Sequence, residues 1–408
     1  PSQRAVTDLR RAVANVSKNS RMNYDGVAVC VPVTIPYSRY SLRSAHWFCG
    51  RALAELIKVA GIAKDEVDGF CVSSFTLAPD SAVGLMQHLG VSPRWLDHIP
   101  MGGASGGVGL RRAARAVQCG DAEIVACIAG DTNHVGSFRN TIASFSQFAN
   151  DAVYPYGSGG PNGSFAFLTD HYMREFGARR EDFAKLCIAQ RDNALAFPHA
   201  LMKRPLTLDA YMDARPIADP LCLFDCVMPC AGAEAYLVMA EDRAKSLNLD
   251  YARILSTIER HNAYPDDPIQ IRGGWAMDVD GFYDLAGIGP EDIDFLQVYD
   301  DYPVICFMQI EDLGFCKKGE AAEFVRTHDL TVAGGDFPIN TSGGQLSVGQ
   351  AGAAGGSLGL VETIRQLTDA NLGAVVQGAR HGLASCFGMI NYDRGLCSSA
   401  AILGRAGA

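Results

Sequence analysis

The sequence predicts an α/β fold made of two related halves. Apolar, strand-like segments alternate with segments of helical periodicity along most of the chain, which is typical of a parallel sheet with helices on both faces. A Gly-rich turn that opens a helix occurs twice, about 240 residues apart. At 408 residues the chain also exceeds the usual size of a single hydrophobic core, so two domains or a duplicated domain are expected.

The N-terminal half is expected to alternate strands and helices. In chain order, the pattern predicts a strand within 23–34, a helix over 45–60, a turn and strand over 62–73, a helix over 81–89, the Gly-rich turn at 102–107 with the helix that it opens, and a strand that ends near 130. The first two helices stop before Gly61 and Gly90, and Gly is the residue that most often follows a helix end.

The segment from about 131 to 220 interrupts this alternation. It is rich in aromatic residues, Pro and Gly, as in D-A-V-Y-P-Y-G-S-G-G-P-N-G, and only a helix around 165–176 stands out. Insertions of this length are usually functional loops, so we expect a lid that determines substrate specificity. Cys222, Cys226 and Cys230 are evenly spaced, but no fourth ligand is near them, which favours apolar lining over a metal site.

Two strands mark the passage from the first half to the second. One covers 231–239, and the next begins at Ala252. A further apolar strand, which ends at Val298, leads directly to the sequence Y-D-D-Y-P at 299–303. Polar residues that follow a buried strand lie at its carboxyl end, where open α/β sheets bind ligands. We therefore expect part of a functional site at 299–302.

The second Gly-rich stretch, 337–360, is the most distinctive part of the sequence. It reads F-P-I-N-T-S-G-G-Q-L-S-V-G-Q-A-G-A-A-G-G-S-L-G-L, and seven of its 24 residues are Gly, which allows a close approach of backbone or ligand. It enters a helix over 357–368, so it presents unpaired amides and a positive dipole end. Tight helix packing would explain the Gly residues but not the interleaved Asn, Gln and Ser, so a bound ligand is expected here.

Composition excludes several classes of protein. The formal net charge of -10 disfavours a nucleic-acid partner, because phosphate binding requires clustered Lys and Arg. No apolar run is long enough to span a membrane, and the first residues lack the apolar core of a signal peptide. The 13 Cys residues are scattered through apolar segments, which is typical of reduced thiols. A cytoplasmic protein without disulfides is therefore expected.

Four motifs, in this order, resemble those of the thiolase superfamily, and within it the sterol-carrier-protein-type branch. The nucleophile turn Cys-x-Ser/Thr-Gly is matched by G-A-S-G at 103–106, and the segment D-G-A-A-A by A-G-A-E-A at 231–235. The segment N-E-A-F or H-D-C-F falls on Y-D-D-Y at 299–302. The long motif N-x-S-G-G-x-x-x-x-G-H-P-x-G-A-x-G is matched by 340–356. The resemblance covers nearly the whole chain.

The resemblance implies a five-layer α-β-α-β-α architecture in which each half has a mixed sheet. The N-terminal half would cover 1–250, including the insert at about 131–220, and the C-terminal half would cover 251–408. The family also implies a homodimer built on the N-terminal half.

Three departures from the family pattern bear on the chemistry. Gly103 stands where a thiolase has its nucleophilic Cys, so no acyl-enzyme forms there by the usual route. Gln350 replaces the family's His, and an amide cannot move a proton near pH 7. Cys386, in C-F-G, is the candidate for the second thiolase Cys, although the Gly run that follows it in the family is absent.

Thiolase-like proteins without the nucleophile include aldolases that cleave β-hydroxyacyl-CoA thioesters, and the resemblance implies this function. A retro-aldol step needs a base for the β-hydroxyl proton and an oxyanion hole for the thioester enolate, but no covalent intermediate. Tyr299 is the main acid/base candidate, because it replaces the family's His or Asn; the alternative is a buried Tyr that is simply hydrogen-bonded. Asp300 or Asp301 could instead carry the proton, or one of them caps the helix that begins at Pro303.

These inferences give a set of candidate residues. The catalytic candidates are Tyr299, Asp300, Asp301, Gln350 and Cys386. The candidates for contact with substrate or CoA are Gly103, Ser105, Asn340, Ser342, Gly343 and Gly388. No metal and no bound cofactor is expected, because coenzyme A belongs to the acyl-CoA substrate. A bulky or aromatic acyl group is suggested by four residues of the insert, Phe145, Phe148, Tyr154 and Tyr156.

Two other functions stay open from the sequence. One is an acyltransferase or condensing enzyme that uses Cys386 or Ser105. The other is a non-catalytic acyl-CoA-binding subunit of a larger complex. In addition, the aldolases that the chain resembles work with a small partner protein bearing an OB-fold and a zinc ribbon, which makes such a partner an expectation for this chain.

Overall fold

The N-terminal half contains five strands of one large sheet and three of the helices that pack on it. A computed structural model describes residues 23–78, 80–137 and 160–407. The strands are β1 (Val27–Ser38), β2 (Gly69–Ser73), β3 (Trp95–His98), β4 (Ile124–Asp131) and β7 (Ala231–Ala240), and the helices are α2 (Ala45–Ala60), α3 (Ala82–Leu89) and α4 (Ser105–Cys119). A short helix, α9 (Glu241–Ser246), leads to the second half.

The C-terminal half repeats this plan with four strands. They are β8 (Tyr251–His261), β9 (Phe295–Gln297), β10 (His381–Asn391) and β11 (Arg394–Arg405). Its helices are α10 (Trp275–Ala286), α11 (Pro303–Asp312), α12 (Ala321–Thr327), α13 (Gly344–Val348) and α14 (Gly355–Leu367). The boundary expected near residue 250 stays a prediction, and it lies in the turn between α9 and β8.

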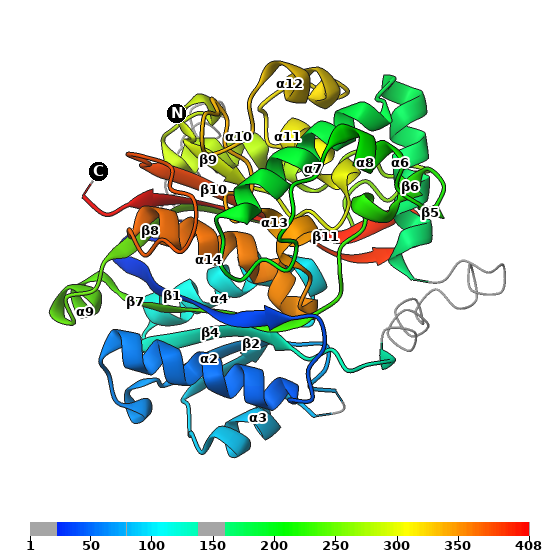
Figure 1. Ribbon diagram of the computed structural model, residues 1–408. Helices are drawn as coiled ribbons and strands as arrows, with labels where there is room; N and C mark the ends of the chain where they lie inside the picture. The colour runs from blue at the N-terminus through cyan, green and yellow to red at the C-terminus, as the bar shows by residue number, and fades with distance from the viewer. Residues whose placement is uncertain (1–22, 79, 138–159, 408) are drawn as a thin grey trace, which may run out of the picture.

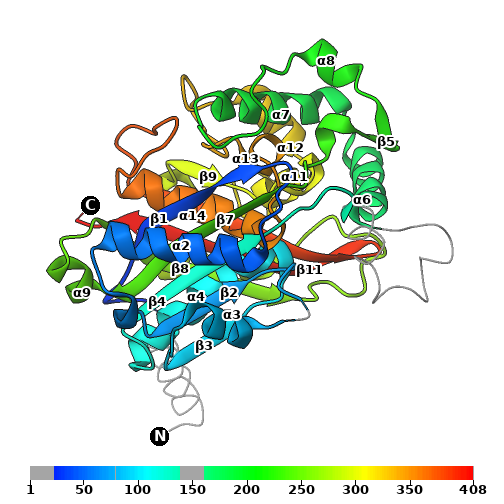
Figure 2. The same ribbon diagram turned by 60° about the horizontal axis from the view of Figure 1, so that its bottom comes forward.

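Five layers alternate through the molecule (Figure 1). Helices α2 and α3 cover the outer face of the N-terminal strands, and α10 covers the outer face of the C-terminal strands. Helices α4 and α14 lie in the middle, where each contacts strands of both halves (Figure 2). Apolar residues of the strands and of both middle helices, such as Val29, Leu110 and Leu360, form a buried core between the halves. The expected five-layer architecture is therefore confirmed.

The strand order reveals the duplication. The strands follow the order β3-β2-β4-β7-β1-β8-β11-β10-β9. Reading outward from the centre gives β1-β7-β4-β2 on one side, with β3 added at the edge, and β8-β11-β10-β9 on the other. The two halves join where Ala28, Val29 and Cys30 of β1 pair with β8. The sheet is mixed: β2 is parallel to β3 and β4, and β9 is parallel to β10, whereas the other neighbouring strands are antiparallel. The simpler expectation of a parallel sheet is thus only partly right.

The two Gly-rich turns meet in the middle layer. Each turn is a short 3-10 segment, η2 (Gly102–Ala104) before α4 and η7 (Gly352–Ala354) before α14. A Cβ atom on Gly106 would lie 2.1 Å from the carbonyl oxygen of Gly356, and a Cβ atom on Gly356 would lie 2.6 Å from the carbonyl oxygen of Gly103. Gly is required here because backbone packs directly against backbone.

The described part of the insert is more helical than expected for 131–220: the helix predicted around 165–176 is present as α6 (Pro161–Phe176), but the rest is not simply a loop. Helices α6 and α7 (Arg180–Leu195) have 16 residues each, and the short elements α8 (Leu208–Met212), β5 (Pro216–Ala218) and β6 (Leu221–Cys222) follow. The composition misled because Pro161 is the first residue of α6, and Pro is favoured at a helix start. The aromatic residues Phe145, Phe148, Tyr154 and Tyr156 lie outside the described residues.

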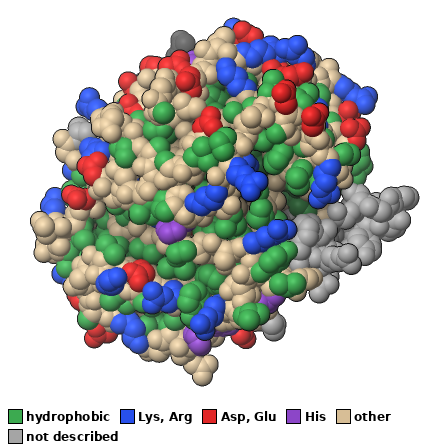
Figure 3. Space-filling model, viewed as in Figure 1, with side chains coloured by type: hydrophobic (Ala, Val, Ile, Leu, Met, Phe, Trp, Pro, Cys, Tyr) green, Lys and Arg blue, Asp and Glu red, His purple; other side chains and the backbone are tan. Residues whose placement is uncertain are grey.

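The surface is mixed in character. On the face of Figure 1, Lys and Arg side chains are interspersed with acidic and hydrophobic ones (Figure 3). In the described part of the chain, no helix combines the length and the apolar character that crossing a bilayer requires.

The contact between the two turns generates a stability prediction. Gly106→Ala should lower the free energy of unfolding by roughly 1–3 kcal/mol or more, because its Cβ atom would lie 2.1 Å from a backbone oxygen that cannot easily move. Gly281→Ala is the matched control, because Gly281 lies in α10 with open space around its Cβ position. The control should be neutral or stabilising by up to about 1 kcal/mol. Urea denaturation measures both, and equal free energies for the two variants would contradict the prediction.

Candidate active site

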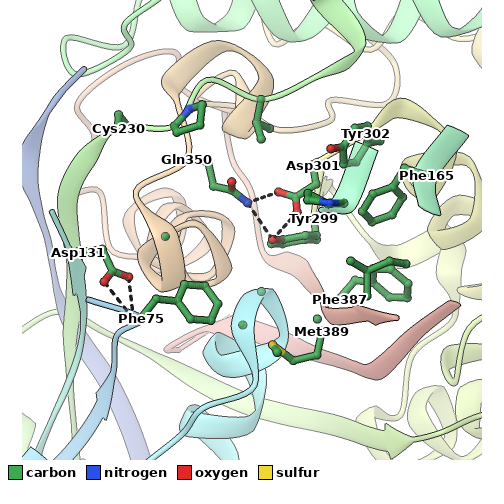
Figure 4. Close-up of a pocket in the computed structure, with 18 of the residues that line it drawn as sticks. Phe75, Asp131, Phe165, Cys230, Tyr299, Asp301, Tyr302, Gln350, Phe387 and Met389 are labelled. Atoms are coloured by element: carbon green, nitrogen blue, oxygen red, sulfur yellow. Dashed lines mark hydrogen bonds between the residues drawn. The ribbon is translucent and has the colours of Figure 1, made fainter. Parts of the chain in front are cut away.

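A cavity of about 140 Å³ lies where the ends of several strands meet the two Gly-rich turns (Figure 4). Its volume would hold several water molecules, so it is not a packing defect. Both halves contribute to it. The lining includes Gly102 and Gly103 of η2, the segments after β4 and β9, Gln350 just before η7, Gly352 at its start, and the C-terminal part of β10. The start of α6 closes one side with Pro161, Asn162 and Phe165.

Tyr299, Asp301 and Gln350 form a hydrogen-bonded triangle on the cavity wall (Figure 4). The Tyr299 hydroxyl donates to Asp301 Oδ2 at 2.8 Å. Gln350 Nε2 donates to Asp301 Oδ1 at 2.5 Å and to the Tyr299 oxygen at 3.3 Å. Both N–H hydrogens of the Gln350 amide are thereby used within the protein. Gln350 orients the other two side chains, rather than presenting a free donor to the cavity.

The surroundings of the triangle change the proton affinity of its members. Burial, with a smaller contribution from the neighbouring Asp300 carboxyl, raises the pKa of Asp301 to about 8, although the Tyr299 hydrogen bond acts in the opposite direction. Burial and the adjacent Asp301 carboxyl hold the pKa of Tyr299 well above its usual value. Tyr299 therefore keeps its proton at neutral pH, and Asp301 is the group of the pair that exchanges a proton near physiological pH.

Tyr299 is fixed by its backbone as well as by its hydroxyl. Its N–H donates to Gln309 Oε1 at 2.9 Å, and Gln309 Nε2 donates back to the Tyr299 carbonyl oxygen at 2.7 Å. Gln309 is fully buried and also accepts a hydrogen bond from the Ser385 hydroxyl. The corner between β9 and α11 is therefore held rigidly, which sets the direction of the Tyr299 ring.

Asp300 points away from the cavity. Its two carboxylate oxygens accept hydrogen bonds from the backbone N–H groups of Gln345 at 2.8 Å and Leu346 at 3.1 Å. Burial raises its pKa to about 7, and these hydrogen bonds oppose the rise. The structure gives Asp300 the role of fixing the start of α13, and its predicted catalytic role gains no support from this geometry.

Three predicted binding residues of the second Gly-rich stretch, Asn340, Ser342 and Gly343, lie buried behind the cavity wall rather than on it. Asn340 Oδ1 accepts a hydrogen bond from the Val298 N–H at 2.8 Å, and a Cβ atom on Gly343 would lie 2.3 Å from Ala194 Cβ. These residues shape the turn, whereas Gly103 and Gly388 line the cavity, and their contact with the substrate stays a prediction.

The two candidate acyl-accepting side chains also lie outside the cavity lining. The Ser105 hydroxyl donates to the Ile99 carbonyl oxygen at 3.0 Å. The Cys386 thiol faces the Gly356 carbonyl oxygen at 3.4 Å, and burial raises its pKa to about 11. Cys230 does line the cavity, but burial raises the pKa of its thiol well above the usual value. None of these three groups is set up as a nucleophile.

Asp131 is a cavity residue that the sequence analysis missed. It is the last residue of β4 and accepts hydrogen bonds from the Thr76 N–H at 2.7 Å, the Ser74 hydroxyl at 2.8 Å and, across the two halves, the Ala353 N–H at 2.7 Å. A Cβ atom on Gly352 would lie 2.2 Å from its Oδ2. The signal that located 299–302, a polar residue at the end of a buried strand, would also have identified Asp131.

An aromatic wall faces the triangle. The rings of Phe165 and Tyr302 stack with centroids 4.0 Å apart, and the Tyr302 hydroxyl donates to Asn162 Oδ1 at 2.5 Å. Phe387 and Met389 of β10 extend this wall, and Figure 4 shows their side chains beside the Tyr299 ring. The site thus combines one proton-exchanging pair with an apolar surface that fits a bulky apolar group.

The comparisons with known proteins identify relatives of the chain. The family model for the thiolase C-terminal domain-like family matches residues 275–405. A steroid side-chain-cleaving aldolase of Thermomonospora curvata is 30% identical over 345 residues, which is 81% of this chain and 87% of that protein. A 17-hydroxy-3-oxo-4-pregnene-20-carboxyl-CoA lyase of Mycobacterium tuberculosis is 28% identical over 387 residues, which is 90% of this chain and 96% of that protein.

A solved structure shows the same fold. The structure described as the Ltp2-ChsH2(DUF35) aldolase matches with a TM-score of 0.80 and 26% sequence identity, and the match covers 94% of this chain and 98% of that chain. The predicted resemblance to thiolase-like proteins, including those that act as aldolases, is therefore confirmed.

The raised pKa of Asp301 generates a prediction about stability. A carboxyl whose pKa is raised by folding stabilises the native state fully below its unfolded value, near 4, and this stabilisation is lost as the pH rises through about 8. Between pH 7 and pH 8, Asp301 alone should lower the free energy of unfolding by about 1 kcal/mol. Asp301→Asn should remove this part of the pH dependence.

Urea denaturation of the wild type and of Asp301→Asn at both pH values measures the difference. Asp170→Asn, at an exposed carboxyl on α6, is the control and should follow the wild type. Parallel behaviour of the wild type and Asp301→Asn would show that Asp301 does not titrate in this range.

Proposed function

Because the chain belongs to the thiolase superfamily, among its thiolase-like aldolases, we propose that it is an enzyme that cleaves a carbon–carbon bond of a β-hydroxyacyl-CoA thioester. The observation on which this proposal depends is the Tyr299–Asp301–Gln350 triangle. It supplies a proton acceptor in the cavity, whereas Gly103 at the nucleophile turn supplies no acyl acceptor. A retro-aldol cleavage uses a proton acceptor and does not need an acyl acceptor.

In the proposed step, the β-hydroxyl of the substrate gives its proton to the Tyr299 oxygen while Tyr299 passes its own proton to Asp301. The bond between the α and β carbons then breaks, which leaves a carbonyl compound and the enolate of the shortened acyl-CoA. The α carbon of the enolate takes up one proton, which balances the proton removed from the hydroxyl. This relay suits a Tyr whose pKa is too high for it to act as a free phenolate and an Asp whose pKa lies near 8.

The enolate oxygen needs hydrogen-bond donors that are already in place. We assign this role to the backbone amides of Gly102 and Gly103, because both residues line the cavity at the start of η2 and the first amides of a helix have no acceptor within it. Preorganised donors of this kind stabilise developing negative charge strongly. The proposed chemistry requires only proton transfer and charge stabilisation, and coenzyme A enters as part of the substrate.

The substrate is proposed to carry a bulky apolar acyl group. Phe165, Tyr302, Phe387 and Met389 give the cavity an apolar wall, and two of the relatives are named for steroid substrates. The geometry does not support the acyltransferase alternative, since neither Ser105 nor Cys386 lines the cavity. The thirteen unpaired cysteines support a cytoplasmic location.

Replacing Tyr299 tests the proposal. Tyr299→Phe keeps the ring and removes the hydroxyl, so kcat should fall by roughly 10²–10⁴, the range typical of lost general acid/base catalysis. Gln350→Ala should cost less, about 10²–10³, because it removes an orienting group. Release of the shortened acyl-CoA from a β-hydroxyacyl-CoA with a bulky apolar acyl group, measured by liquid chromatography, gives the rates.

The matched control is Tyr283→Phe, which removes another buried hydroxyl whose partner, the Leu313 carbonyl oxygen, lies outside the cavity lining. This variant should lose stability without loss of rate.

In the wild type, the rate should rise with pH through about 8, because the Asp301 carboxylate is the active form. A folded Tyr299→Phe enzyme with the wild-type rate would shift the assignment to Asp301 acting alone.

We propose that the assembled enzyme is a homodimer and that it works with a small OB-fold and zinc-ribbon partner protein. Support for a partner comes from the solved structure described as the Ltp2-ChsH2(DUF35) aldolase, whereas the homodimer is proposed from the family resemblance. Light scattering of the purified chain should give a mass of twice 43.6 kDa. A stable species of 43.6 kDa would contradict the dimer, and full activity of the chain alone would contradict the need for a partner.

A further inference from the structure

The backbone of Gly103 lies directly against the Tyr299 ring. A Cβ atom on Gly103 would lie 2.1 Å from Tyr299 Cζ and 2.2 Å from Cε2, and it would also lie 2.3 Å from the Phe387 carbonyl oxygen. Atoms of folded proteins do not approach this closely. The Tyr299 ring therefore occupies the space into which any side chain at position 103 would project.

Space, and not backbone conformation, makes Gly necessary at this position. Gly102 has a φ of 54°, in the region that favours Gly, but Gly103 is not among the described glycines with positive φ. The backbone φ of Gly103 is therefore one that an L-residue can adopt. The constraint is steric, and it comes from the Tyr299 ring together with the Phe387 carbonyl oxygen.

The Tyr299 ring has little freedom to yield. Its backbone is clamped by Gln309, with hydrogen bonds of 2.9 and 2.7 Å, and its hydroxyl is bound to Asp301 at 2.8 Å. The ring is almost fully buried, with 6% of its residue surface exposed. A side chain at 103 must therefore push the ring, and with it the hydroxyl, away from Asp301.

We infer that Gly103 is a positioning residue for the reaction, because its missing side chain lets the Tyr299 ring sit where its hydroxyl reaches Asp301. The inference rests on the proposed function, and it identifies positions 103 and 299 as one unit. A nucleophilic side chain at the turn and the Tyr299 ring in its present place exclude each other. With Gly103 and the Tyr299 ring in these positions, the site can transfer protons but cannot form a covalent intermediate at this turn.

Gly103→Ala tests the inference through rate. It should lower kcat by about as much as Tyr299→Phe does, roughly 10²–10⁴. In the Tyr299→Phe background the same change should lower kcat by less than about threefold more, because residues that act as a unit are not additive. A wild-type kcat for folded Gly103→Ala, or fully additive losses in the double variant, would overturn the inference.

Stability gives a second, independent readout. Gly103→Ala should lower Tm when Tyr299 is present. In the Tyr299→Ala background, the same substitution should lower Tm by less than about half as much. The loss of Tm that remains there is due to the contact with the Phe387 carbonyl oxygen. If Gly103→Ala does not fold, folding of the Gly103→Ala/Tyr299→Ala protein would support the inference. Equal Tm losses in both backgrounds, or failure of both proteins to fold, would overturn it.

The control is Gly382→Ala in β10, which creates a similar contact away from the cavity. A Cβ atom on Gly382 would lie 2.3 Å from Cζ of the Phe295 ring, and neither residue lines the cavity. It should lower Tm and leave kcat within a few-fold of the wild type, so a comparable loss of kcat in this control would also count against the inference.

The Tm measurements separate this inference from the proposed function. If Tyr299→Phe keeps the wild-type rate, the catalytic role of Tyr299 fails, whereas the Tm measurements still decide whether Gly103 and Tyr299 are coupled.

Discussion

The direct backbone contact between the two Gly-rich turns is the constraint on which the rest of the structure depends. Gly106 and Gly356 allow α4 and α14 to meet in the middle layer with no side chain between them. This contact brings η2 of one half and η7 of the other to the same cavity. Side chains from distant parts of the chain, such as Gln350 and the residues after β9, reach the cavity because the two halves approach so closely.

The cavity is held in shape by buried polar groups that cross between elements. Asp131 at the end of β4 binds the 74–76 loop of its own half and the Ala353 amide of the other. Gln309 fixes the corner that presents Tyr299, and Asp300 fixes the start of α13. Each of these groups is buried and hydrogen-bonded to backbone groups, and Asp131 and Gln309 also to side-chain hydroxyls, so the walls of the site are rigid before any ligand enters.

The chemistry of the site follows from what burial does to neighbouring groups. A carboxyl with reduced access to water, beside a second carboxyl, holds its proton up to about pH 8, and a phenol beside it stays protonated. The same closeness of packing that raises these pKa values leaves no room for a side chain on Gly103. The absence of a side chain at position 103 and the burial of the Tyr299–Asp301 pair are thus two aspects of one arrangement.

The sequence by itself determined the layered α/β fold, the duplication and the position of 299–302 at a strand end, because periodicity, Gly-rich turns and motif order are local properties. It also placed Gly103, Gly388, Gln350 and Tyr299 among the residues of the site. It missed Asp131 and helix α7 of the insert. It also did not separate Asp301, which lines the cavity, from Asp300, Asn340 and Cys386, which do not. The tertiary structure decided these points, because the direction of a buried side chain depends on which backbone groups lie opposite it, and those come from the other half of the chain.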